Sequence, residues 1–164
     1  MDILPDEILQ NLRIFAFLLF VKRIILRLVS RRWSRLLFDH SLLQQVVINM
    51  YTNCEDHQLE PLMSAAKRVV EVDFCGCLHL TGSCLLSTDL SRLRKLTLTD
   101  TAIENGTLLT ILNSCKDELI ELNLTRTLIS MCECLPKIVE LKKLKYFAAP
   151  PLTTMVWYGM VYFI

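Results

Sequence analysis

Two stretches of the chain read almost alike: LRKLTLTDTAI at residues 93–103 and LIELNLTRTLI at residues 119–129. Both fit the frame L-x-x-L-x-L-x-x-T-x-I, and the second copy begins 26 residues after the first. In each copy leucine alternates with polar residues, as in Leu96-Thr-Leu98, which is typical of a strand with one buried face. The chain therefore contains a repeated unit that begins with a short strand.

Weaker copies of the frame begin at Leu43, Val69 and Leu141. The spacing between successive starts lies in the range of about 20–29 residues that is found in leucine-rich repeats. In such repeats a small polar residue satisfies backbone groups after the strand, and Thr101 and Thr127 occupy this place. The pattern predicts leucine-rich repeats, and the alternative is an ordinary α/β domain with leucine-rich strands.

The predicted fold is α/β, with a three-helix N-terminal region followed by a short solenoid that has parallel strands inside and helices outside. Residues 1–42 lack the repeat, and Ile8, Leu12 and Phe15 recur at helical spacing. Within the repeats, a polar loop is predicted at residues 51–59. Helices are predicted at residues 60–67, 83–90, 106–114 and 135–141, with Gly106 and Pro136 compatible with helix starts.

Composition excludes several classes of protein. The 164 residues are 52% hydrophobic, which is enough for a core, and the net charge of +1 identifies no partner. Seven cysteines within apolar patterns favour a reduced, intracellular chain. The N-terminus lacks the features of a signal peptide, and the apolar run at residues 14–21 is shorter than the roughly 20 residues of a membrane helix. We expect a cytoplasmic and/or nuclear protein without a membrane span.

The N-terminal region contains four short motifs in order: LPDEIL at residues 4–9, IFAFL at 14–18, LVSRRW at 28–33 and DHSL at 39–42. In these motifs and their spacing the region resembles an F-box. With the repeats that follow, the chain resembles an F-box/leucine-rich-repeat protein. The resulting domains are an F-box at residues 1–45, leucine-rich repeats at 46–150 and an apolar tail at 151–164.

The resemblance implies a non-enzymatic substrate receptor of a cullin–RING ubiquitin ligase. The F-box would bind a Skp-type adaptor, and the repeats would hold a substrate protein whose identity the sequence does not give. The alternative is a leucine-rich-repeat interaction module whose F-box does not dock. The residues that match the family's adaptor-facing positions are Leu4, Pro5, Ile8, Leu9, Phe15 and Trp33.

Strand alternation predicts a second binding surface. If Leu96 and Leu98 point into the core, the intervening side chains point onto the concave face of the sheet. Stacking the repeats places mostly polar side chains there in columns, with Phe147 as a candidate anchor, and the alternative is a plain solvated face. The candidate substrate-binding residues are Glu71, Asp73, Lys95, Thr97, Thr99, Glu121, Asn123, Thr125, Lys143, Lys145 and Phe147.

Other chemistry has weaker support. Cys75-Gly-Cys77 and Cys132-Glu-Cys134 have one residue between the cysteines, whereas paired zinc ligands usually have about two to four. The three histidines show no recognisable spacing to a nucleophile and an acid. A cysteine-dependent redox or metal protein is a third alternative, but we expect no catalysis, cofactor or metal. The basic residues between Lys22 and Arg35 favour a solvated rim over nucleic acid or anionic lipid, so no nucleic-acid partner is expected.

The C-terminal tail departs from the pattern, because no charged residue follows Lys145. Its β-branched and aromatic residues favour a strand that pairs with an open sheet edge. Two explanations remain. Residues 156–164 fold back over the last repeat as a cap, or the chain is a truncated product whose further repeats would cover residues 141–146. The Pro150-Pro151 pair favours truncation, because it breaks the pattern where the next helix would begin.

Overall fold

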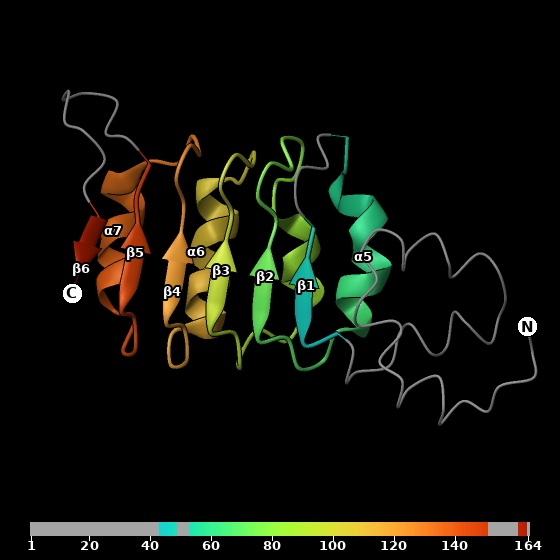
Figure 1. The fold of residues 1–164 in the computed structure, drawn as a ribbon, viewed down its shortest axis with the longest axis horizontal. Helices are drawn as coiled ribbons and strands as arrows, with labels where there is room; N and C mark the ends of the chain where they lie inside the picture. Colours follow the sequence, from blue (N-terminus) through green and yellow to red (C-terminus); the bar gives the residue numbers. More distant parts are fainter. Residues whose placement is uncertain (1–42, 49–52, 151–160, 164) are drawn as a thin grey trace, which may run out of the picture.

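The computed structural model describes residues 43–48, 53–150 and 161–163. The predicted N-terminal helices lie outside these residues. One sheet runs through the described part, and its strands follow the order of the chain (Figure 1). Five strands are parallel: β1 (Gln45–Val47), β2 (Glu71–Asp73), β3 (Lys95–Thr97), β4 (Glu121–Asn123) and β5 (Tyr146–Ala148).

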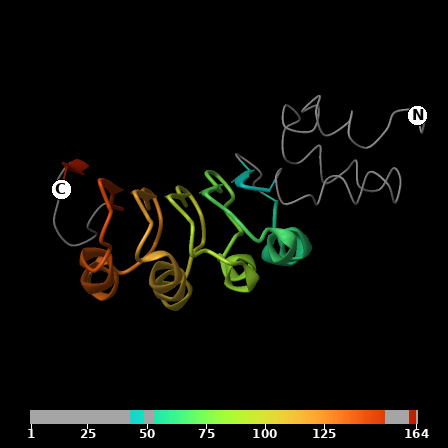
Figure 2. The ribbon, with the colours of Figure 1, turned by 90° about the horizontal axis from the view of Figure 1, so that it is seen from below.

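Helical segments connect the parallel strands and lie together on one side of the sheet (Figure 2). The strands form one layer and the helices the other, so each strand and the helical segment after it make one unit that packs on the next. The helical segments are α5 (Asp56–Ala65), the 3-10 helix η1 (Ser83–Ser87), α6 (Asn105–Cys115) and α7 (Met131–Val139).

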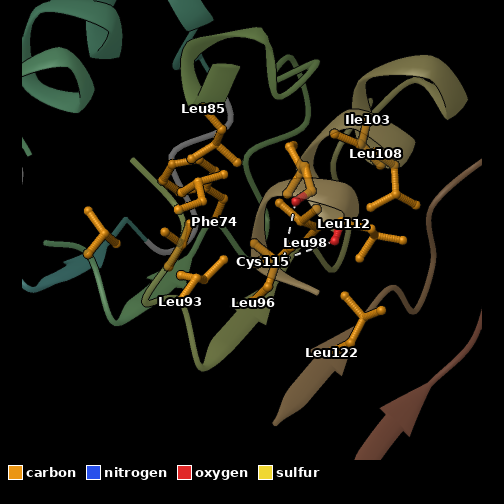
Figure 3. Close-up of a cluster of buried hydrophobic side chains, with 14 of the residues drawn as sticks. Phe74, Leu85, Leu93, Leu96, Leu98, Ile103, Leu108, Leu112, Cys115 and Leu122 are labelled. Carbon is orange, nitrogen blue, oxygen red and sulfur yellow. Dashed lines mark hydrogen bonds between the residues drawn. The ribbon is translucent and has the colours of Figure 1, made fainter. Parts of the chain in front are cut away.

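Strand register confirms the predicted frames that begin at residues 43, 69, 93 and 119. Val46 pairs with Val72, Val72 with Leu96, and Leu96 with Leu122. All four side chains are fully buried, because every second residue of a strand faces the helices. Figure 3 shows this core between the strands and the helical layer.

The register predicted for the last unit is wrong. Leu122 pairs with Phe147 and not with Leu144, so the frame begins at Leu144 rather than at Leu141. The residues Leu141, Leu144 and Phe147 are all buried and follow one another at a spacing of three. The L-x-x-L part of the frame therefore fits two starts. In the structure Leu141 ends the turn after α7, with its N–H donating to Ile138 O at 3.1 Å.

The threonines predicted to follow the strands make the expected hydrogen bonds. The Thr101 hydroxyl donates to Leu98 O at 2.8 Å, and the Thr127 hydroxyl donates to Leu124 O at 2.7 Å. Both threonines are buried. Cys77 stands at the corresponding place in an earlier unit, where its thiol donates to Ile48 O at 3.0 Å. These bonds satisfy carbonyls where the chain leaves the strand.

The helical segments predicted between residues 60 and 141 exist, with changed bounds. The helix predicted at 106–114 agrees with α6 within a residue at each end. The loop predicted up to residue 59 is wrong from Asp56 onward, because Glu55 and Gln58 form a capping box that starts α5 there. The segment predicted at 83–90 is the shorter η1. Pro136 does not start a helix but lies inside α7, which begins at Met131.

The tail adds a sixth strand to the sheet. β6 (Val161–Phe163) pairs antiparallel with β5, with Phe147 opposite Tyr162. This confirms the predicted strand at the sheet edge, and these residues fold back on the last unit as in the cap arrangement. Among the described residues, helices that combine enough length and apolar character to cross a bilayer are absent.

Candidate protein-binding surface

The face of the sheet opposite the helical layer of Figure 2 is open, and strand pairing arranges its residues in two rows. Strand pairing sets the rows, because residues with paired Cα positions on neighbouring parallel strands face the same side. The first row is Gln45, Glu71, Lys95, Glu121 and Tyr146. The second row is Val47, Asp73, Thr97, Asn123 and Ala148, of which Ala148 is buried.

Lys95 joins three strands through charge. Its Nζ lies 3.3 Å from Glu71 Oε1 and 3.7 Å from Glu121 Oε2, and all three side chains are partly exposed. The hydrogen bond and the charge of Glu71 raise the pKa of Lys95, so the ammonium stays charged. Two carboxylates and one ammonium leave this part of the row acidic.

Asp73 and Asn123 perform the same task in different units. Asp73 Oδ1 accepts the Cys75 N–H at 3.0 Å, and Asn123 Oδ1 accepts the Thr125 N–H at 3.1 Å. Each side chain thus bonds the backbone two residues further on, as in an Asx turn. The Thr125 hydroxyl also lies 2.8 Å from Asn123 Oδ1 and 3.0 Å from the Thr99 hydroxyl. This end of the face is therefore ordered by its own hydrogen bonds.

The loops beyond the strands repeat one backbone conformation. Gly76, Asp100 and Arg126 occupy equivalent places and have φ values of 77°, 55° and 58°. Arg126 Nε lies 2.8 Å from Asp100 Oδ1, so an ion pair joins two of these loops. Arg126 is largely exposed, and such pairs contribute about 0–1 kcal/mol. The pair orders the loops more than it stabilises the fold.

Most of the predicted substrate-facing residues meet on this surface. Strands β2, β3 and β4 and the residues just after them supply Glu71, Asp73, Lys95, Thr97, Thr99, Glu121, Asn123 and Thr125. None of these side chains is fully buried. The structure thus brings together side chains that lie up to 54 positions apart in the chain, from 71 to 125.

Three predicted residues do not belong to the surface as proposed. Phe147 is 5% exposed and packs in the core, so it is not an outward anchor. Lys143 lies in the turn before β5 and pairs with Glu118, and Lys145 is exposed just ahead of that strand. All three errors follow from the shifted frame of the last unit.

Sequence reasoning also missed four members of the two rows: Gln45, Val47, Tyr146 and Ala148. Tyr146 takes the place assigned to Lys143, and Val47 stands beside Asp73 in the second row. Both are 37% exposed. The polar face thus has an apolar or aromatic side chain near each end. For Val47, the alternation of residues in the frame that begins at Leu43 indicated the outward position.

Two histidines that the sequence left unassigned meet at a shallow hollow of about 480 Å³ beside α5. His57 Nδ1 lies 3.2 Å from Glu55 Oε2. The carboxylate of Asp56 accepts hydrogen bonds from the backbone N–H groups of Thr81 and Cys84. The hollow is lined by Glu55, Asp56, His57, Glu60, His79, Thr81, Ser83 and Cys84.

The buried cysteines pack as apolar residues. Burial raises the pKa of the Cys115 thiol to about 12 and also raises that of Cys84. At neutral pH both are protonated and are poor nucleophiles and metal ligands. Within the part of the chain that the structure describes, three or more His, Cys, Asp or Glu side chains suited to a metal do not meet.

Comparison with known families concerns the N-terminal region. The family model described as F-box-like matches residues 1–49, a stretch that contains the four motifs quoted above. The chain therefore carries an F-box-like domain, which points to F-box-mediated protein interaction. The predicted adaptor-facing residues Leu4, Pro5, Ile8, Leu9, Phe15 and Trp33 lie within this match but outside the described residues. The comparison with curated proteins found no match.

Proposed function

We propose that this chain is the substrate-recognition subunit of an SCF-type (Skp–cullin–F-box) ubiquitin ligase. The F-box-like match at residues 1–49 carries the proposal, since F-box domains bind Skp-type adaptors. In this scheme residues 1–45 dock the adaptor, and the cullin and RING subunits bound through it supply the ubiquitin-transfer chemistry. The chain itself acts without catalysis, in the cytoplasm and/or nucleus.

We further propose that residues 46–150 are leucine-rich repeats that bind the substrate protein. Four features support this: parallel strands in chain order, helical connections on one side, the buried alternating frame, and the hydroxyl bonds of Thr101 and Thr127. The open polar face of β2–β4 is the surface for the substrate. Its ordered hydrogen bonds leave it rigid, which lowers the entropy cost of binding.

Adaptor binding is tested by co-expressing a Skp-type adaptor with the full chain. The wild-type chain should co-purify with the adaptor, and the double variant Leu4→Ala/Pro5→Ala should not. Val139→Ser is the control, because Val139 is 75% exposed on α7 and is not among residues 1–49 of the F-box-like match. Equal recovery with the double variant, or none with wild type, rejects docking and leaves an interaction module with a non-docking F-box.

Substrate binding is tested separately with Thr97→Arg, which places a large cation at the centre of the open face. Proteins held by this face should be lost from the purified complex while the adaptor is retained. The double variant in the F-box should show the reverse pattern. If both variants retain the same partners, the face does not bind substrate.

A further inference from the structure

A row of exposed apolar residues lies on the loops at the carboxyl ends of the strands. Leu128 is 95% exposed and Leu78 is 50% exposed, and each directly follows a buried residue, Thr127 or Cys77. Ala102, also exposed, follows Thr101 at the equivalent place in the unit between them. The three residues therefore repeat along one edge of the sheet, the upper edge in Figure 1.

These loops are held in place by the backbone. The Gly76 N–H donates to Thr99 O at 2.9 Å, and the Asp100 N–H donates to Thr125 O at 3.2 Å. The hydrogen bond from the Thr127 hydroxyl to Leu124 O holds the residue just before Leu128 in place. The exposure of Leu128 is thus a feature of an ordered loop, and a partner would find this side chain in a fixed position.

The same edge is acidic. Within residues 73–79, 97–104 and 123–133, all of which the structure describes, the acids are Asp73, Asp100, Glu104 and Glu133. The one Lys or Arg in these ranges is Arg126, which is paired with Asp100. Glu104 and Glu133 lie at the N-terminal ends of α6 and α7, where the positive end of the helix dipole stabilises acidic side chains. The helix dipoles do not explain why leucines are exposed between these acids.

The opposite edge of the sheet, where the strands begin, has the reverse charge. Within residues 67–70, 89–94, 116–120 and 140–145, eight Lys or Arg outnumber four Asp or Glu. The cations include Lys67, Arg68, Arg92, Lys116 and Lys145. A net charge of only +1 therefore conceals two edges of opposite sign. Such a separation steers a partner of complementary charge to one edge.

We infer that the edge formed by Leu78, Ala102 and Leu128 and the flanking acids docks a protein segment that presents apolar side chains beside Lys or Arg. This inference rests on the proposed function and assigns the class of substrate segment. The open sheet face pairs much of its own charge, through Glu71, Lys95 and Glu121. The edge adds exposed apolar side chains whose removal from water on binding is favourable, and its acids select for basic neighbours.

The experiment selects binders of the full-length chain from a display library of random short peptides. Peptides that combine apolar residues with Lys or Arg should be enriched. Labelled copies of them should bind at least about tenfold more weakly to Leu128→Ser and to Glu104→Lys. Leu86→Ser is the matched control, because Leu86 is a 51% exposed leucine on η1, in the helical layer, and this variant should bind as wild type.

Circular dichroism and thermal melting establish whether each variant is folded. If Leu128→Ser does not fold, Leu78→Ser takes its place in the experiment. An absence of enriched peptides, or enriched peptides without basic residues, overturns the inference. The inference is also overturned if peptide binding is lost in Thr97→Arg but unchanged in Leu128→Ser. That result would still support substrate binding by the open sheet face. Adaptor co-purification is scored independently of all these results.

Discussion

Asp56 and Thr81 are joined by two hydrogen bonds across 25 positions of the chain. One carboxylate oxygen of Asp56 accepts the Thr81 N–H at 2.7 Å and the Thr81 hydroxyl at 3.0 Å, and the other accepts the Cys84 N–H at 3.0 Å. The carboxylate thereby ties the start of α5 to the loop before η1. Burial alone would raise the pKa of Asp56, but the bonds from Cys84 and Thr81 outweigh it, and the pKa is lowered.

Asp56→Ala should destabilise the fold by about 1–3 kcal/mol at neutral pH, because it leaves partly buried N–H groups without an acceptor. A lowered folded-state pKa stabilises the fold above the ordinary value of 3.8, and this contribution is lost as pH falls through the folded-state pKa. Urea titrations should therefore show a smaller difference from wild type in acid. Glu60→Ala, at an exposed site of the same helix, is the control. A pH-independent difference would contradict this account.

Gly82 has a φ of 83° and packs tightly, and a Cβ there would stand 2.3 Å from Ile103 Cδ1. Gly82→Ala should cost about 1–3 kcal/mol from the left-handed backbone alone, and more from the contact. Gly106 is the matched control, since a Cβ there meets nothing within 4 Å and the residue is helical. Gly106→Ala should be neutral or stabilise by up to about 1 kcal/mol. Equal melting temperatures for the two variants would contradict the left-handed backbone and the tight packing at Gly82.

Phe147→Ala should destabilise the fold by about 3–5 kcal/mol, because the side chain is 5% exposed in the core of the last unit. Lys143→Ala should change stability by no more than about 0.5–1 kcal/mol, because it removes only a surface ion pair with Glu118. Guanidinium titrations of the two variants decide between the registers. Similar small effects at both positions would restore Phe147 to the outer face.

The pairing of β5 with β6 predicts the effect of removing residues 156–164. Deletion exposes the backbone N–H and C=O groups of β5 that now pair with Val161–Phe163, and an unpaired edge promotes association between chains. The melting temperature should fall by roughly 2–4 °C per kcal/mol lost, and light scattering should show larger species. An unchanged melting temperature together with a larger monomer fraction would show that the pairing does not stabilise the last unit.

Much of the repeat architecture was predictable from residues 43–129. Leucine or valine at alternating positions must face one side of a strand, and the helices cover that side, so Val46, Val72, Leu96 and Leu122 align and are buried. The threonines after β3 and β4 were also recognisable, since a short hydroxyl side chain can reach the carbonyl three residues back. The register of the last unit could not be predicted, because the buried residues at 141, 144 and 147 satisfy the same three-residue spacing in two registers.

The sequence by itself determined which strand residues of the first four units enter the core and which N-terminal motifs define the F-box-like domain, because local periodicity and motif spacing carry that information. Tertiary structure alone decided which outward residues meet. Lys95 reaches both Glu71 and Glu121, and Asp100 reaches Arg126, because parallel strands with aligned registers bring residues about 24–26 positions apart to neighbouring places. The exposure of Leu128 has the same origin: the bonds that bury Thr127 leave the next side chain directed into solvent.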